Sequence, residues 1–282
     1  MVNKFNSLDR LKNIKQNFRN GEGGSRIKKG NNKSPTFTII TVVLNNEKYL
    51  EETIKSVLDQ KFKDFEYILI DGGSVDNSLN IIKKYSDYID YWVSEKDLGI
   101  YDAFNKGMTL AKGKFIGIVN SDDKYFEDSL EIISRYIFKY PSIDFIFGSV
   151  KKHWGVLHGY KPKKIYYSWG FYTSHSTGFF IKTSSAKKIG FYNLKYKYHA
   201  DYDYFYRMIV KEKMLGMATS KDEIIGEFRR GGFSSTISFW KLFKEEILIR
   251  YDNGQNLILI LIIFVYKFIF HSKKIFISNK KY

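Results

Sequence analysis

Five apolar runs, separated by segments with helical spacing, constrain the fold of this chain more than any other sequence feature. The run FTIITVVL (37–44) is continuous and rich in β-branched residues, as expected of a strand buried on both faces of a sheet. Further strands are predicted at FEYILI (65–70), YIDYWVS (88–94), KFIGIVN (114–120) and DFIFGSV (144–150). Runs of this kind require a sheet that is covered by helices on both sides.

The segments between these runs carry apolar residues at spacings of three and four, which predicts helices. The first stripe begins at Leu50, and Asn45 or Asn46 is the expected N-cap. Asp76 is the expected cap of the helix after the second strand. Strands that alternate with helices imply right-handed crossovers and therefore an α/β fold with a mostly parallel central sheet.

The composition is that of a globular protein from a reducing compartment. The chain has 282 residues, of which 44% are hydrophobic and 18% aromatic, so it is long enough for a large core. It contains no cysteine. This excludes disulfides, thiolate zinc sites and a cysteine nucleophile, and it fits a cytoplasmic protein.

The net charge of +16 is concentrated at the two ends of the chain. Residues 1–34 carry a net charge of +7 and residues 267–282 carry +5, which leaves only +4 for the residues between them. This distribution argues against a core that binds nucleic acid. It favours an anionic surface as the partner of the termini.

Both ends are expected to lie outside the α/β domain. In residues 1–34 no apolar signal sequence follows the first residue, and a basic amphipathic helix is predicted instead, followed by a flexible linker from residue 20. Residues 241–282 are predicted to form a hydrophobic helix with a basic tail. Its apolar run from Leu257 to Tyr266 is broken by Lys267 and is too short to span a bilayer.

These ends suggest peripheral attachment to the inner face of the cytoplasmic membrane, because basic and apolar residues together favour an anionic lipid surface. A core helix or a homodimer interface is the alternative for the C-terminal run.

Acidic residues follow the carboxyl ends of several predicted strands. Glu47 follows the first strand, Asp71 ends the second, and Asp122 and Asp123 follow the fourth. Ligands of open α/β sheets bind at this edge. Clustered carboxylates require compensation by a cation or by hydrogen-bond donors, and Mg²⁺ or Mn²⁺ prefers oxygen ligands together with substrate phosphates. A turn or helix-cap role is the alternative for each acid taken singly.

Two long segments carry a resemblance to a known family. They are TIITVVLNNEKYLEETIKSVLDQKFKDFEYILIDGGSVDNS (38–78) and SEKDLGIYDAFNKGMTLAKGKFIGIVNSDD (94–123). They resemble family 2 glycosyltransferases, which are nucleotide-sugar enzymes with the GT-A fold, and especially those that assemble bacterial surface polysaccharides. The match is strong over residues 36–135 and weaker through 174–208 and 226–235.

The resemblance implies a catalytic domain at residues 35–240, with a nucleotide-sugar half (35–125) and an acceptor half (126–240). The implied reaction moves a hexosyl or N-acetylhexosaminyl group from a nucleotide-diphosphate donor, expected to be a UDP-sugar, to a glycan or a lipid-linked acceptor. The implied cofactor is Mn²⁺ or Mg²⁺.

On the donor side, Asp71 matches the residue that binds the donor's base in this family. Thr41, Asn45 and Glu47 match positions that line the same pocket. By the same resemblance, NSDD (120–123) stands where the family has its DxD motif, with Asn in place of the usual first acid.

Within that motif, Asp122 is expected to face the ribose or a metal-bound water, and Asp123 to ligate the metal. Arg229, in FRRGG, is expected to contact a phosphate, because a guanidinium binds phosphate through paired hydrogen bonds. A surface turn is the alternative for that segment.

On the acceptor side, Asp201 in HADYDYFYRM matches the family's catalytic carboxylate. Burial among tyrosines is expected to raise its pKa and so strengthen it as a base. Asp203 is the alternative base, and an N-cap is the alternative role for Asp201. His175 matches a recurrent histidine and is expected to border the acceptor. One displacement with one base implies inversion at the anomeric carbon.

Three other classes of protein also place acids near strand ends. A nucleotidyltransferase is disfavoured because LNNEKY (44–49) lacks a glycine-rich phosphate loop. A non-catalytic sugar-binding module has no need for both Asp123 and Asp201. A receiver-type signalling domain is roughly half as long as this chain.

Overall fold

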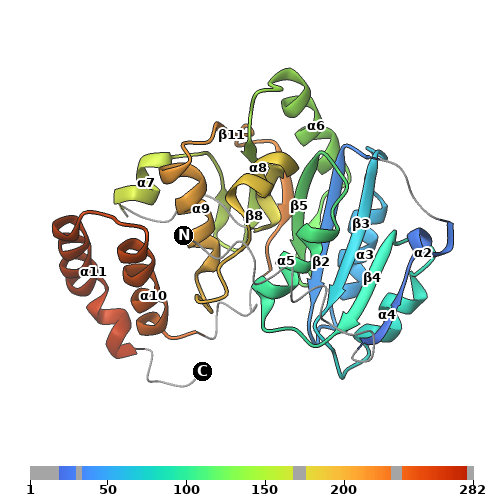
Figure 1. The fold of residues 1–282 in the computed structure, drawn as a ribbon, viewed down its shortest axis with the longest axis horizontal. Helices are drawn as coiled ribbons and strands as arrows, with labels where there is room; N and C mark the ends of the chain where they lie inside the picture. The colour runs from blue at the N-terminus through green and yellow to red at the C-terminus, as the bar shows by residue number, and fades with distance from the viewer. Residues whose placement is uncertain (1–18, 30–33, 168–175, 230–236, 278–282) are drawn as a thin grey trace.

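The computed structural model describes residues 19–29, 34–167, 176–229 and 237–277, and it has the predicted α/β architecture (Figure 1). The large sheet has the strand order β1-β4-β3-β2-β5-β10-β7-β11. Its strands are β1 (Arg19–Gly23), β2 (Phe37–Val43), β3 (Phe65–Asp71), β4 (Tyr91–Glu95), β5 (Phe115–Asn120), β7 (Phe145–Phe147), β10 (Phe179–Lys182) and β11 (Gly216–Ala218). The four central strands β4, β3, β2 and β5 are parallel, as predicted, whereas β1 and β10 are antiparallel to their neighbours.

Helices bury both faces of this sheet, which explains why its central strands are mostly apolar and buried. Alternate residues of each strand enter two separate clusters of buried side chains, one on each face. One face is covered by α3 (Leu50–Leu58), α4 (Ser78–Lys84) and α6 (Ser129–Lys139). The other is covered by α5 (Ile100–Leu110), α8 (Thr183–Ile189) and α9 (Ala200–Tyr206), which continues as a π-helical turn, η3 (Arg207–Lys211).

A second, smaller sheet has the order β6-β12-β8-β9. Its strands are β6 (Lys124–Tyr125), β8 (Ser149–Lys152), β9 (Gly155–Leu157) and β12 (Ile224–Glu227). The prediction of one strand over 144–150 was wrong, because the chain passes from β7 in the large sheet to β8 in the small one at Gly148. A Cβ atom at Gly148 would lie 2.2 Å from Ile225 Cδ1, so a larger residue here would force the buried side chain of Ile225 to move.

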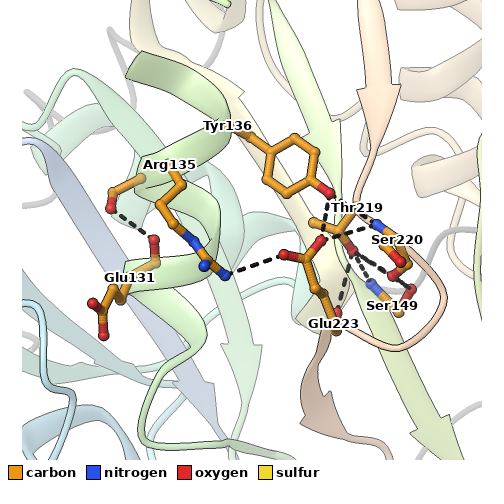
Figure 2. A network of polar contacts seen from close by, with 8 residues as sticks. Glu131, Arg135, Tyr136, Ser149, Thr219, Ser220 and Glu223 are labelled. Carbon is orange, nitrogen blue, oxygen red and sulfur yellow. Dashed lines mark hydrogen bonds and ion pairs between the residues drawn. The ribbon is translucent and has the colours of Figure 1, made fainter. Parts of the chain in front are cut away.

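A polar network holds the second sheet against α6 (Figure 2). Arg135 donates to Glu223 at 3.1 Å, and the Tyr136 hydroxyl also donates to Glu223. The amide of Ser220 donates to the Tyr136 hydroxyl at 3.0 Å, and Ser149 donates to the carbonyl of Ser220 at 2.8 Å. The network fixes the loop before β12, and β12 leads directly to Arg229.

Two elements precede β2 among the described residues. β1 pairs with β4 at the edge of the large sheet, and α2 (Ser25–Lys29) follows it. The prediction of a flexible linker was therefore wrong for residues 20–29. The predicted N-terminal helix falls on residues 1–18, which lie outside the described residues.

The C-terminal segment forms two helices, not the single helix predicted for 241–282. They are α10 (Phe239–Asp252) and α11 (Leu257–Ile277), which lie side by side at the end of the molecule opposite α2 (Figure 1). Phe243 stacks on Phe264 with ring centroids 5.2 Å apart, and Trp240 contacts Phe268. Two short helices complete the described chain: α7 (Pro162–Tyr167) and the 3₁₀ turn η2 (Ser176–Gly178).

A buried ion pair joins this hairpin to α7. Arg250 is fully buried, lies 2.9 Å from Glu246, and donates to the carbonyl of Tyr166 at 2.8 Å. Lys267 of α11 contacts the same Glu246 at 2.5 Å. Burial acts to raise the pKa of Glu246, but the charges of Lys267 and Arg250 outweigh it and lower that pKa from 4.5 to about 2. The pairing of the ionised Glu246 with these two cations therefore stabilises the fold at neutral pH. This stabilisation is lost as the pH falls from about 4.5 towards 2.

We expect Arg250→Met to lower the free energy of unfolding by about 3–5 kcal/mol, because it leaves the carboxylate of Glu246 buried with one cation fewer. Urea unfolding at pH 7 measures the change. The control is Arg135→Met, which removes an exposed arginine from its pair with Glu223 and should cost less than about 1 kcal/mol. Equal changes in the free energy of unfolding for the two variants would show that the buried Arg250 pair contributes no more to stability than an exposed pair.

Candidate active site

Asp71 lies at the carboxyl end of β3 and is fully buried. Its carboxylate accepts hydrogen bonds from the hydroxyls of Ser74 and Ser94, both at 2.5 Å, and from the amide of Ser74 at 3.1 Å. These donors come from the loop after β3 and from β4. They hold the carboxylate at the edge of the sheet where ligands of α/β proteins bind.

The loops that follow β2 and β3 are fastened to each other. Asn45 has a left-handed backbone (φ 51°), its amide donates to Ser74 Oγ at 2.8 Å, and its side-chain oxygen accepts from the amide of Val75 at 2.8 Å. Glu47 accepts from the amide of Asn77 at 2.8 Å. The prediction that Asn45 or Asn46 caps the following helix was wrong, because α3 begins later, at Leu50, with no side-chain cap.

The same edge continues to the end of β5. Asn46 Nδ2 donates to Ser121 Oγ at 2.9 Å, so the β2 loop also contacts the residue next to Asp122. In register, Val43 of β2 lies beside Asp71 and Val42 lies beside Asn120. Because adjacent strands are about 4.8 Å apart, the ends of β3 and β5 lie about 10 Å apart across β2. The structure thus places the acids after both strands on one edge.

Asp123 is fully buried, although an aspartate side chain in water is ionised at neutral pH. Its Oδ2 accepts from the Thr177 hydroxyl at 2.6 Å, and its Oδ1 accepts from the amide of Arg229 at 3.1 Å. Burial, followed by the charge of Asp122, raises the pKa of the Asp123 carboxyl to about 8. Burial also raises the pKa of Asp122. Two adjacent acids with raised pKa values call for a cation.

The residues present fit a divalent cation. Besides the two carboxylates, Asn120 Oδ1 is buried and has no hydrogen-bond partner within the described residues. Carboxylate and amide oxygens suit Mg²⁺ or Mn²⁺. Across the described ranges, no group of three or more His, Asp or Glu residues surrounds one point. Such a site, with two acids and an amide, is the kind that substrate phosphates complete.

Arg229 follows β12 and lies beside the acids. Its guanidinium pairs with Glu52 of α3 and lies over the Tyr49 ring, 4.7 Å from the centroid. Its charge acts against the rise in the pKa of Asp122. Arg229 therefore joins the acid cluster through its backbone amide and its charge, while Glu52 engages the side chain.

Asp201 lies in the second half of the chain and contacts α5. It lies in the first turn of α9, and its Oδ1 accepts from the Tyr101 hydroxyl of α5 at 3.1 Å. The N-cap of α9 is His199, so the N-cap alternative for Asp201 does not hold. The loop before α5 contains Asp97, which lies close to Gly72. A Cβ atom added to Gly72 would be only 2.4 Å from Asp97 Oδ2. Asp201 is thus linked through α5 and its preceding loop to the residue after Asp71.

Two further predicted site residues have other surroundings. Asp203 is buried, and its two oxygens accept from Arg207 Nε at 2.8 Å and Asn253 Nδ2 at 2.9 Å. Thr41 is fully buried within β2, where its hydroxyl accepts from the Tyr67 hydroxyl at 2.9 Å. His175 lies outside the described residues.

The profile of glycosyl transferase family 2 matches residues 38–205, which is more than half of the chain and includes the acids described above. The chain belongs to this family. It is a glycosyltransferase.

Curated relatives of this glycosyltransferase have related names. A PGL/p-HBAD biosynthesis glycosyltransferase of Mycobacterium bovis is 28% identical over 243 residues, covering 81% of this chain and 90% of the relative. An uncharacterized glycosyltransferase of Methanocaldococcus jannaschii is 29% identical over 230 residues, covering 74% of this chain and 77% of the relative.

Solved structures show that the glycosyltransferase has the GT-A fold. S. aureus TarS 1–349 in complex with UDP-GlcNAc superimposes with a TM-score of 0.65 at 18% identity, covering 87% of this chain and 76% of that one. Another TarS chain matches with a TM-score of 0.62, and only 40% of its length is covered. A mannosyltransferase of Pyrobaculum calidifontis in complex with GDP-Man and Mn²⁺ has a TM-score of 0.59 at 15% identity, covering 79% of this chain and 65% of that one.

Several residues of the glycosyltransferase site were not predicted. Ser74 and Ser94 donate to Asp71, and Thr177 donates to Asp123. The sequence DGGS (71–74) could have indicated Ser74, because Asp followed by two glycines is typical of a tight turn that brings the next residue back towards the Asp. Thr177 carried none, since only the pairing of β10 with β5 brings it to Asp123.

Proposed function

We propose that this glycosyltransferase is metal-dependent and inverting, and that it moves a sugar from a UDP-sugar to a glycan or lipid-linked acceptor during synthesis of a bacterial surface polysaccharide. Support for the donor comes from TarS, which was solved with UDP and with UDP-GlcNAc. Support for the metal comes from the mannosyltransferase solved with Mn²⁺ and from the fit of the oxygen cluster described above. The surface-polysaccharide role extends the sequence resemblance.

In this proposal Asp123 holds the metal, and Asp122 faces the ribose or a metal-bound water. The Asn120 side-chain oxygen is a further ligand, because it is buried without a partner in the described part of the chain. A bound Mn²⁺ or Mg²⁺ would neutralise charge on the departing diphosphate. Thr177 and the amide of Arg229 hold the Asp123 carboxylate in position.

The donor's base lies at Asp71, beside the loops that contain Asn45 and Glu47. Glu47 acts mainly by fastening these loops, since its carboxylate accepts from the Asn77 amide. Arg229 lies on the phosphate side of the site. Thr41 has no direct contact with the donor in this proposal, because its side chain is enclosed in the core.

Asp201 is the proposed base. It takes the proton of the acceptor hydroxyl as that oxygen bonds to the anomeric carbon. The bond from this carbon to the diphosphate oxygen breaks, and its electron pair leaves with the nucleoside diphosphate. Asp203 is less suited to this role, because Arg207 and Asn253 occupy its oxygens. His175 is proposed to border the acceptor.

The observation that carries the proposal is the buried Asp123, next to a second acid and joined along one sheet edge to Asp71. The test is a panel of nucleotide sugars, assayed for release of nucleoside diphosphate with Mn²⁺ and with EDTA. We expect release from a UDP-sugar with Mn²⁺ and little release with EDTA. Equal release under both conditions would contradict metal dependence, and release from a GDP-sugar alone would contradict the uracil assignment.

We also propose that α11 binds an anionic membrane surface where a lipid-linked acceptor is held. Ile258, Leu261, Val265 and Ile269 form one face of this helix, and Ile258 is 70% exposed and Leu261 62% exposed. The sequence that follows is basic, which complements anionic lipid headgroups. No helix in the described ranges is both long enough and apolar enough to cross a membrane.

For this surface, we expect Leu261→Ser/Val265→Ser to reduce flotation with phosphatidylglycerol-containing vesicles by about ten-fold, because buried apolar area drives interfacial binding. The matched control is Phe138→Ser/Leu215→Ser, two exposed residues elsewhere, which should leave flotation unchanged. Undiminished flotation of the α11 variant would contradict the proposal. Loss of a dimer in light scattering, without a change in flotation, would assign this face to a second copy of the chain.

A further inference from the structure

Lys152 has no assigned role, although it lies beside the acid cluster. It is the last residue of β8, where side chains alternate: Val150 is buried in the core, Lys151 is exposed, and Lys152 is half-buried. Lys151 points outwards and lies 3.8 Å from Glu227. Lys152 therefore projects to the same side as Val150, towards the interior of the site.

The ammonium group of Lys152 lacks an anionic partner at close range. It lies over the ring of Phe228, 4.4 Å from the centroid, and takes part in no hydrogen bond or ion pair within the described residues. Phe228 immediately precedes Arg229, whose amide donates to Asp123. Burial lowers the pKa of Lys152, and the charge of Asp123 acts in the opposite direction. The ammonium group is thus close enough to Asp123 to sense its charge.

A bound metal would change the balance of charge around Lys152. A divalent cation held by Asp123 would offset the negative charge that acts on Lys152. The guanidinium of Arg229 is already paired with Glu52, so Lys152 is the nearby cation that remains without a counter-ion at ion-pairing distance in the described chain. A cation–π contact with Phe228 compensates an ammonium group less well than an anion does. With a metal bound, the site would therefore have room for one more anion beside Lys152.

We propose that Lys152 binds the diphosphate of the nucleotide-sugar donor. During transfer the electron pair of the broken bond moves to the terminal phosphate oxygen of the leaving group. Lys152 donates a hydrogen bond to that phosphate and keeps its proton, while the acceptor's proton goes to Asp201. This inference rests on the donor site of the proposed function.

The test compares Lys152→Met with Lys152→Arg and with Lys151→Met, its exposed neighbour on the same strand. Calorimetry in the presence of Mn²⁺ measures the affinity for UDP, for uridine and for inorganic pyrophosphate. We expect Lys152→Met to weaken UDP and pyrophosphate about ten-fold or more, with uridine changed less than about two-fold, as for loss of a charge-assisted hydrogen bond. Lys152→Arg should retain most of the affinity, and Lys151→Met should match the wild type.

Two outcomes would overturn the inference. Equal weakening of UDP and uridine by Lys152→Met would show that the lysine supports the fold of the site, and unchanged affinity for pyrophosphate would show that it does not contact phosphate. Failure of the proposed function looks different: wild-type protein that binds pyrophosphate but not UDP would contradict the UDP assignment. The pyrophosphate measurements would still decide the role of Lys152.

Discussion

Asp201→Asn is expected to lower the rate of sugar transfer about a thousand-fold while leaving the affinity for UDP within about two-fold. Asparagine keeps the size of the side chain, but it cannot accept the proton of the acceptor hydroxyl. The Tyr101 hydroxyl can still donate to the amide oxygen at position 201, so the local structure should persist. Steady-state transfer rates and UDP calorimetry, measured on the same preparation, give the two quantities.

The matched control is Asp203→Asn, two residues further along α9. This variant removes a charged partner of Arg207 and should lower the free energy of unfolding by about 1.5–3 kcal/mol, with a smaller effect on transfer. If Asp203→Asn instead abolished transfer in folded protein while Asp201→Asn remained active, the base would be Asp203. A parallel loss of UDP binding in Asp201→Asn would give Asp201 a structural role only.

Asp123→Ala is expected to lower transfer about a thousand-fold or more and to remove its dependence on Mn²⁺. The reason is that a metal held by Asp123 would neutralise charge on the leaving diphosphate, a contribution of several kcal/mol to catalysis. Transfer assayed across a Mn²⁺ titration measures both effects. A rate that still rises with Mn²⁺ in the variant would contradict the assignment of Asp123 as the metal ligand.

Because Asp123 also accepts hydrogen bonds, its structural role needs a separate control. Thr177→Val removes the hydroxyl that donates to Asp123 but keeps the carboxylate and the shape of the side chain. We expect this variant to retain metal-dependent transfer within about ten-fold of the wild type. A thousand-fold loss in Thr177→Val would attribute the effect of Asp123→Ala to collapse of the local structure.

The sequence predicted the central strands well because their signal lies in their own side chains. β2, β3 and β5 are buried on both faces, and each is rich in apolar residues along its length. β1 was missed because RNGEG (19–23) has no such run, and its pairing with β4 depends on backbone groups at a sheet edge. The division between β7 and β8 was missed because the close contact of Gly148 with Ile225 joins residues far apart in the chain.

The part of the candidate site that follows from the order of strands and helices could be predicted from the sequence. Asp71 and Asp123 follow strands of a parallel sheet, so their common edge follows from the alternation of strands and helices. Three of the groups that act on Asp123 come from the second half of the chain: the Thr177 hydroxyl, the Arg229 amide and the charge of Lys152. No spacing in the sequence relates these residues to residue 123, so only the three-dimensional packing brings them together.

The most direct measurement of the central claim is the affinity for UDP with Mn²⁺ and with EDTA, determined by calorimetry on the wild type and on Asp123→Ala side by side. If one metal joins the acids of this edge to the donor's diphosphate, Mn²⁺ will tighten UDP binding at least about ten-fold in the wild type and will have no effect in the variant. The same UDP affinity in wild-type protein with Mn²⁺ and with EDTA would contradict the account.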